Sequence, residues 1–152
     1  MTTQLDPTHI MQTATAFWPS KVLLTAVELD LFSVLGEGAM AAPALGQALG
    51  LHPRGWYDFF DALVALKFLH RDGDGPDARY RNTPETGAFL NKHSPAYIGG
   101  LAEMLNARLF GFWNDLGAAL KTGKPQNETR DGGAGLFEAL YADEARLGQF
   151  LQ

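Results

Sequence analysis

Apolar side chains recur every three or four positions over several segments of this sequence, which is the spacing of one face of an α-helix. Asp6 and Pro7 are suited to begin a first helix, which we expect to run to Phe17, where a nearby proline interrupts it. Helical spacing resumes at Ser20 and continues until two glycines follow residue 35. The pattern therefore predicts two helices over residues 8–35.

The most regular stretch is AAPALGQALGLHPRGWYDFFDALVALKFL, residues 41–69. Pro43 opens a short helix, Gly50 ends it, and Pro53 opens another after a tight turn. FLHRDGDGPDARYRN, residues 68–82, has two short alternating runs around a Gly, Asp and Pro turn, which predicts a β-hairpin. This order predicts a winged-helix core over residues 40–90, ending in a short helix that begins at Thr83.

The longest predicted helix covers residues 95–121 and begins at Ser94 and Pro95. Its apolar row predicts a buried face and consists of Ile98, Leu101, Leu105, Leu109, Phe112, Leu116 and Leu120. Asn106, Phe110 and Trp113 form a second row, displaced by about 100° on a helix of 3.6 residues per turn. We therefore expect this helix to have apolar surface on two sides.

Residues 122–135, TGKPQNETRDGGAG, have the composition of an exposed loop. Helical spacing returns in LFEALYADEARLGQFLQ, residues 136–152, and no cap or breaker follows it. We expect this last helix to be incomplete, with more protein after it. The helices at residues 8–35 and 95–121 carry more apolar surface than the winged-helix core can cover, which favours a helical homodimer.

The composition narrows the class of protein. With 152 residues, 46% of them hydrophobic, the chain is long enough for a real core, and it has no cysteine for disulfides or thiolate metal sites. No run reaches the roughly 18 apolar residues that a membrane span requires, and the N-terminus MTTQLDPTHI lacks the pattern of a signal peptide. We expect a cytoplasmic protein that does not bind membranes.

The charge disfavours binding to nucleic acid. The formal net charge is −5, and the helix expected over residues 53–66 has one base, Arg54, against Asp58 and Asp61. Over residues 51–82 five Lys or Arg balance five Asp. This helix is better suited to packing than to reading bases.

Residues that could carry chemistry are few. His9, His52, His70 and His93 lie in four different predicted elements, which gives no metal site. GDGPDA, residues 73–78, has the letters of a dinucleotide motif, but a strand-like segment follows it where a helix is needed. We identify no catalytic residue, no metal site and no cofactor site in this chain.

Two pairs of aromatic residues have two interpretations. Phe17 and Trp18 lie at the first helix break, and Phe110 and Trp113 lie on the long helix. They fit a core or a dimer interface. They also fit, as the less favoured interpretation, a site for a flat aromatic ligand, with Asn106 supplying an amide hydrogen bond.

Several segments together carry a resemblance to a known family: FWPSKVLLTAVELDLFSVL, LGQALGLHPRGWYDFFDALVALKFL, YRNTPE, YIGGLAEMLNARLFGFWNDLGAALKTGKPQN and LFEALYADEARLGQFL. They resemble, in order, the N-terminal dimerisation domain of S-adenosylmethionine-dependent O-methyltransferases of the plant phenolic type and their bacterial natural-product relatives. The resemblance implies a mainly α, winged-helix-like domain with one small β-hairpin, intertwined with its copy in a homodimer.

The same resemblance implies contacts with the aromatic molecule that accepts the methyl group. NARLFGFW resembles the segment that lines the acceptor pocket, which points to Asn106, Phe110 and Trp113. ATAFWPS resembles the segment that enters the partner's pocket, which points to Phe17 and Trp18. The resemblance also points to Met11, shortly before this segment. These residues are expected to contact the acceptor and not to catalyse.

In the family a Rossmann-like domain follows, with a glycine-rich loop for S-adenosylmethionine and a histidine base, and the printed sequence ends before both. The resemblance therefore implies a single dimerisation domain over residues 1–152, with residues 136–152 starting the linker and the cofactor expected only for a full-length parent. One alternative is a stand-alone binder of aromatic small molecules, or a cofactor-independent enzyme on the same scaffold. A winged-helix regulator that binds DNA is the other, which the charge disfavours.

Overall fold

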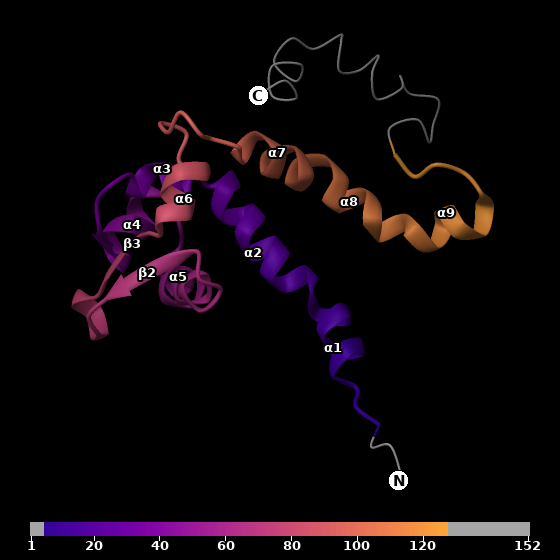
Figure 1. Cartoon of the computed structure of the whole chain (residues 1–152), viewed down its shortest axis with the longest axis horizontal. Helices are drawn as coiled ribbons and strands as arrows, with labels where there is room; N and C mark the ends of the chain where they lie inside the picture. Colours follow the sequence, from indigo (N-terminus) through magenta and orange to yellow (C-terminus); the bar gives the residue numbers. More distant parts are fainter. Residues whose placement is uncertain (1–4, 128–152) are drawn as a thin grey trace.

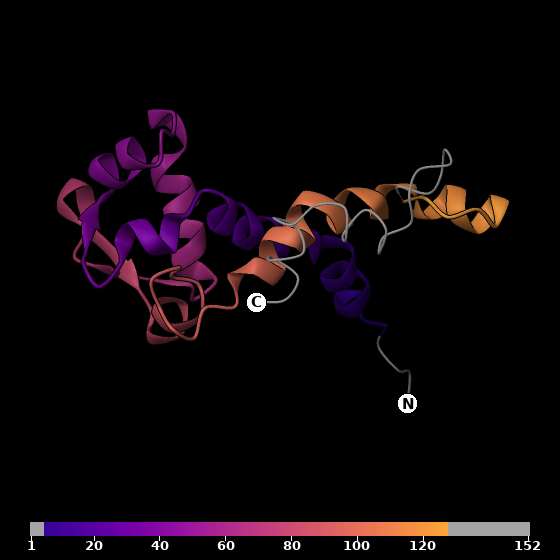
Figure 2. The same cartoon turned by 90° about the horizontal axis from the view of Figure 1, so that it is seen from above.

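The computed structural model describes residues 5–127, so the helix and linker expected over residues 136–152 lie outside the described residues. A compact winged-helix core, residues 31–90, lies at one end of the molecule (Figure 1). Two helical arms leave this core on the same side (Figure 2). The first arm comprises α1 and α2, residues 8–28, and the second arm comprises residues 99–122. The predicted mainly α, winged-helix-like fold is confirmed.

The elements follow the chain in a simple order. The first arm contains α1 (Thr8–Thr15) and α2 (Phe17–Glu28). The core contains α3 (Leu31–Leu35), β1 (Met40–Ala41), α4 (Ala42–Ala48), the 3-10 turn η1 (Pro53–Gly55), α5 (Trp56–Ala65), β2 (Leu69–Asp72), the 3-10 turn η2 (Gly75–Asp77), β3 (Arg79–Asn82) and α6 (Pro84–Phe89). The second arm contains α7 (Gly99–Met104), the π-helix η3 (Leu105–Leu109), α8 (Phe110–Phe112), the 3-10 turn η4 (Trp113–Asp115) and α9 (Leu116–Thr122).

The prediction for residues 8–35 needs two corrections. The first helix ends at Thr15, and α2 begins at Phe17, with Pro19 in its first turn, where a missing N–H costs little. The expected single helix from Ser20 is wrong, because α2 ends at Glu28 and Asp30 takes a left-handed φ of 58°. This break turns α3 into the core.

The core lies between α3, α4, α5 and the sheet. Its largest fully buried side chains are Tyr80, Phe32, Phe60, Leu31, Leu45, Leu63 and Leu69. The rings of Phe60 and Tyr80 meet at 5.4 Å between centroids, which is the ordinary separation of a packed aromatic pair. The apolar face of α5 therefore packs on the sheet, as a winged-helix core requires.

The predicted hairpin is confirmed, but the sheet has a third strand. All pairs are antiparallel in the order β1-β3-β2, with Arg71 opposite Tyr80 and Met40 opposite Tyr80 on the other side. The prediction of one hairpin alone missed β1 because a strand of two residues, Met40 and Ala41, has no alternation to detect.

The second arm differs from the helix expected over residues 95–121. Helix begins at Gly99, because Ser94 and Tyr97 form a turn and the N–H of Ile98 donates to the carbonyl of Phe89 at 2.9 Å. The expected burial of its apolar row is also wrong for the single chain. Five members of that row are exposed, at 36–78%: Ile98, Leu101, Leu105, Leu116 and Leu120.

Within the described residues, no helix combines the length and the apolar character that crossing a membrane requires.

Candidate functional site

The side-chain amide of Asn106 is held between the two arms. Its Oδ1 accepts a hydrogen bond from Nζ of Lys21, and its Nδ2 donates to Oε2 of Glu28. Both partners lie on α2, seven positions apart and therefore on one helix face. The orientation of the amide is fixed, since each end has a partner that only donates or only accepts.

Lys21 also contacts an aromatic ring of the second arm. Its Nζ lies 5.0 Å from the centroid of the Phe110 ring, within the range of a cation–π interaction. Lys21 is half-buried and is the one charged side chain between Asp6 and Glu28, with histidine taken as neutral. The sequence interpretation missed it. A lone cation in an apolar helix was the available signal.

A change of helical pitch accompanies this contact. Asn106 lies in the π-helix η3, and Phe110 is the first residue of α8. Single π turns inside α-helices occur frequently at functional sites, because the extra residue turns the following side chains to a new direction. Here the wide turn lies directly opposite α2, where both Asn106 and Phe110 meet Lys21.

The first-arm candidates are exposed. Met11 on α1 is 57% exposed, and Phe17 and Trp18 at the start of α2 contact each other edge to face, with centroids 5.6 Å apart. The arms diverge from the core, so α1 lies far from α9 (Figure 1). Phe17 and Trp18 precede Lys21 by four and three residues, which places them one helical turn from it.

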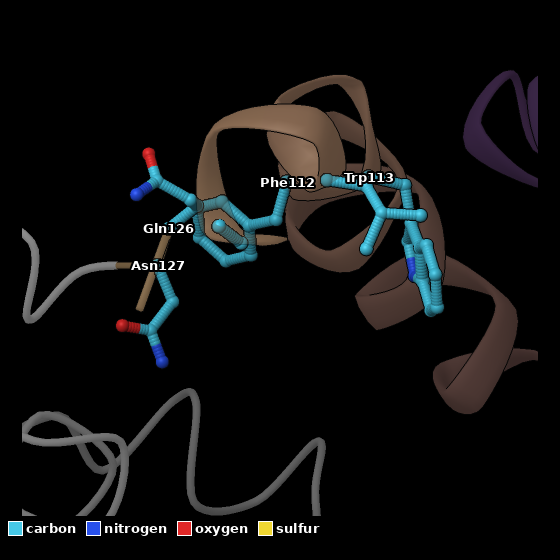
Figure 3. Close-up of a pocket in the computed structure, with 6 residues that line it drawn as sticks. Phe112, Trp113, Gln126 and Asn127 are labelled. Carbon is cyan, nitrogen blue, oxygen red and sulfur yellow. The ribbon is translucent and has the colours of Figure 1, made fainter. Parts of the chain in front are cut away.

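Trp113 borders a shallow pocket at the far end of the second arm. This pocket, about 210 Å³ in volume, is lined by Phe112, Trp113, Leu116, Ala119, Gln126 and Asn127. Figure 3 shows the Phe112 ring pointing toward Gln126 and Asn127, with the Trp113 indole on the opposite side of the helix. The structure therefore brings Asn106 and Phe110 together around Lys21, while Trp113 follows one turn later at 68% exposure.

A polar network fixes the second arm where it leaves the core. Nζ of Lys92 lies 3.0 Å from Oε1 of Glu103 and 3.4 Å from Oδ1 of Asp30, and the Tyr97 hydroxyl donates to Glu103 at 3.1 Å. Burial lowers the pKa of Lys92, but the hydrogen bond and charge of Glu103, helped by Asp30, outweigh it and raise the pKa overall. Burial, then the bond to Glu103, raises the pKa of the Tyr97 hydroxyl. The arm's base is thereby attached to the left-handed residue that ends the first arm.

The arginines of the hairpin each have a partner within the fold. Arg71 pairs with Asp61 at 3.3 Å, and Arg81 pairs with Asp72 at 2.7 Å. The hydrogen bond from Arg81 is the main cause that lowers the pKa of Asp72. Arg79 donates to the carbonyl of Ala39 at 3.3 Å. The hairpin arginines therefore contact groups of the fold itself, with the Arg79 and Arg81 contacts lying at the surface.

Across residues 5–127, no group of three or more His, Cys, Asp or Glu side chains is arranged to hold a metal ion.

Comparison with known proteins gives a consistent match. The O-methyltransferase dimerisation domain family matches residues 11–92, over half of the chain. The tetracenomycin polyketide synthesis 8-O-methyl transferase TcmO of Streptomyces glaucescens is 40% identical over 145 residues, covering 95% of this chain and 41% of that protein. The N,N-dimethyltransferase OxyT of Streptomyces rimosus is 34% identical, covering 99% and 44%.

The solved structures agree. Human N-acetylserotonin methyltransferase in complex with SAM superposes with a TM-score of 0.83 at 28% identity, covering 100% of this chain and 46% of that one. The chain spans about two fifths of the length of the curated relatives it matches.

Proposed function

This chain belongs to the O-methyltransferase dimerisation domain family, and we propose that it pairs with a second copy through its two arms and supplies contacts to a small-molecule methyl acceptor. Under this proposal, S-adenosylmethionine binding and methyl transfer belong to the part of the relatives that this chain does not span.

The exposed apolar surface of the arms carries the proposal. On the first arm Ile10, Met11, Phe17 and Trp18 are exposed, and on the second arm Leu101, Leu116 and Leu120 are exposed. Several large apolar side chains exposed on the same helices are typical of a surface that a partner covers. A second copy that inserts its arms beside these helices would bury both rows, which gives the intertwined homodimer expected from the sequence.

The acceptor contacts are assigned to the same arms. Asn106, Phe110 and Trp113 are proposed to line the acceptor site, with Met11, Phe17 and Trp18 entering the site of the partner copy. The exposed rings of Phe17, Trp18 and Trp113 and the polar groups around Asn106 fit a site for an aromatic molecule, which needs a largely apolar lining with few oriented polar groups. The relatives act on different acceptor atoms by name, an oxygen for TcmO and a nitrogen for OxyT, so the proposal concerns binding of the acceptor and leaves its reacting atom open.

Multi-angle light scattering on the purified chain tests the dimer. We expect a dimer at micromolar concentration, and we expect Leu101→Glu and Leu120→Glu to shift it toward monomer, because burying an unpaired carboxylate in an apolar interface is costly. Tyr57→Glu is the matched control, since Tyr57 is an exposed apolar residue on the core and not on an arm. A monomeric wild-type chain would contradict the proposal.

A further inference from the structure

Lys21 is a cation whose direct contacts are neutral, while the Glu28 carboxylate binds the other end of the same Asn106 amide. Its amine contacts the amide oxygen of Asn106 and the ring of Phe110, and no carboxylate of the described residues forms an ion pair with it. Drawing a charged amine out of water is unfavourable unless other groups compensate. A half-buried lysine with only neutral contacts is therefore a place where an anionic oxygen would be stabilised.

The donors of Lys21 are not exhausted. An ammonium group has three N–H donors, and Asn106 accepts one of them. The Asn106 amide, by contrast, has its oxygen on Lys21 and its nitrogen on Glu28. The group with spare donor capacity and charge at this point is Lys21. Asn106 acts as a positioning residue that holds the amine in place.

Exposed aromatic residues precede Lys21 on α2 and follow Phe110 on the second arm. Phe17 and Trp18 lie one helical turn before Lys21, and Trp113 lies one turn after Phe110. All three are more than half exposed, at 53%, 61% and 68%. These rings supply exposed apolar surface on the two helices that form the Lys21 contact.

We propose that Lys21 is a specificity-determining residue that selects aromatic acceptors with an anionic oxygen, a carboxylate or a phenolate, over neutral analogues of the same shape. The inference rests on the proposed function of acceptor contact and adds the class of acceptor. Lys21 supplies the electrostatic attraction for the acceptor, and the exposed rings supply the apolar contacts.

Competition between two matched probes tests the proposal on the full chain. 2-Naphthoate and 2-naphthamide share one ring system and differ in charge, and ligand-observed NMR with both in one sample gives their relative affinities. We expect the wild-type chain to prefer the anion by about five- to tenfold, as for a partly solvated charge-assisted hydrogen bond. Added salt should reduce that preference.

Three substitutions separate the roles. Lys21→Met should abolish the preference while binding of 2-naphthamide persists, and Lys21→Arg should retain the preference because it keeps the charge. Lys124→Met is the control, since Lys124 is exposed beyond α9. Circular dichroism checks that each variant folds. If Lys21→Met does not fold, Lys21→Gln replaces it, and we expect the same loss of the preference for the anion.

The outcomes distinguish this inference from the proposed function. An unchanged preference in Lys21→Met, or an equal weakening of both probes, would overturn the inference and leave acceptor contact standing. Equal affinity of the wild-type chain for the two probes would also overturn the inference and leave acceptor contact standing. If the wild-type chain binds neither probe, acceptor contact itself fails and the inference fails with it, while the dimer is judged separately by light scattering.

Discussion

The hydroxyl of Tyr80 donates a 2.7 Å hydrogen bond to Oδ1 of Asp61, which joins the central strand β3 to α5. The Tyr80 side chain is fully buried, and Asp61 also receives Arg71 at 3.3 Å. Asp61 on the helix in the reading position of a winged helix therefore serves the interior of the core. The acid at position 61 of that helix has a structural role.

Tyr80→Phe should destabilise the core. It removes the bond to Asp61 and leaves the ring in place, so we expect a loss of about 1 kcal/mol in the free energy of unfolding, the usual net value of one hydrogen bond. Urea denaturation followed by circular dichroism measures it. Tyr57→Phe is the control, because Tyr57 lies on α5 but is exposed. Equal stability of the two variants would contradict the structural role of the bond.

The same tyrosine predicts a loss of stability at alkaline pH. Burial, followed by the bond to Asp61 and its charge, raises the pKa of Tyr80 from 10.0 to about 12. The folded state thus retains a proton that the unfolded state releases. The stability that the protonated Tyr80 hydroxyl gives the folded state is fully present below pH 10 and is lost as the pH rises toward and through 12. Unfolding free energies over that range should fall less steeply for Tyr80→Phe than for the wild type. Parallel curves would refute the assignment.

Local signals predicted the core well. Pro43 lies in the first turn of α4, Gly50 follows its end with a left-handed φ of 66°, and Pro53 opens the η1 turn that leads into α5. Thr83 caps α6 through the N–H of Thr86 at 3.2 Å, as its place before a proline predicts. These features depend on residues near each other in sequence, so sequence reasoning can detect them.

Features that depend on distant partners were not predictable. Leu31 and Leu35 keep the spacing of α2, so the sequence cannot show that Asp30 ends one helix and redirects the next. The periodicity of the second arm predicts an apolar face, but it does not show which surface covers that face. Lys21 is ordinary in sequence and becomes informative only when Asn106 and Phe110 are placed beside it.

Close packing of α4 on α5 makes Gly46 sensitive to substitution. A Cβ there would lie 2.2 Å from Nε1 of Trp56, whose indole donates to the carbonyl of Leu51 at 2.9 Å. Gly46→Ala should lower the free energy of unfolding by about 1–3 kcal/mol, the usual cost of overpacking. Gly55→Ala is the matched control, because a Cβ there meets nothing within 4 Å. Chemical denaturation measures the loss in free energy of unfolding for both variants. Equal losses would argue against the close packing of α4 on α5.

The C-terminus of α5 has the geometry of a glycine cap but carries a lysine. Lys67 has a φ of 64°, with its N–H on the carbonyl of Val64 and the N–H of Phe68 on that of Leu63. Gly50 after α4 makes the same pair of bonds, with Gln47 as one acceptor. The two helix ends differ mainly in the side chain at the left-handed residue.

Exchange at these two positions should have opposite effects. Lys67→Gly should raise the free energy of unfolding by up to about 1 kcal/mol, because glycine avoids the steric cost of the left-handed region while losing some backbone entropy. Gly50→Lys should lower it by a similar amount, although the position is open, since nothing lies within 4 Å of a Cβ there. Thermal and urea unfolding of both variants provide the measurement. If Lys67→Gly is destabilising, the lysine side chain makes a contribution at this helix end that exceeds its backbone strain.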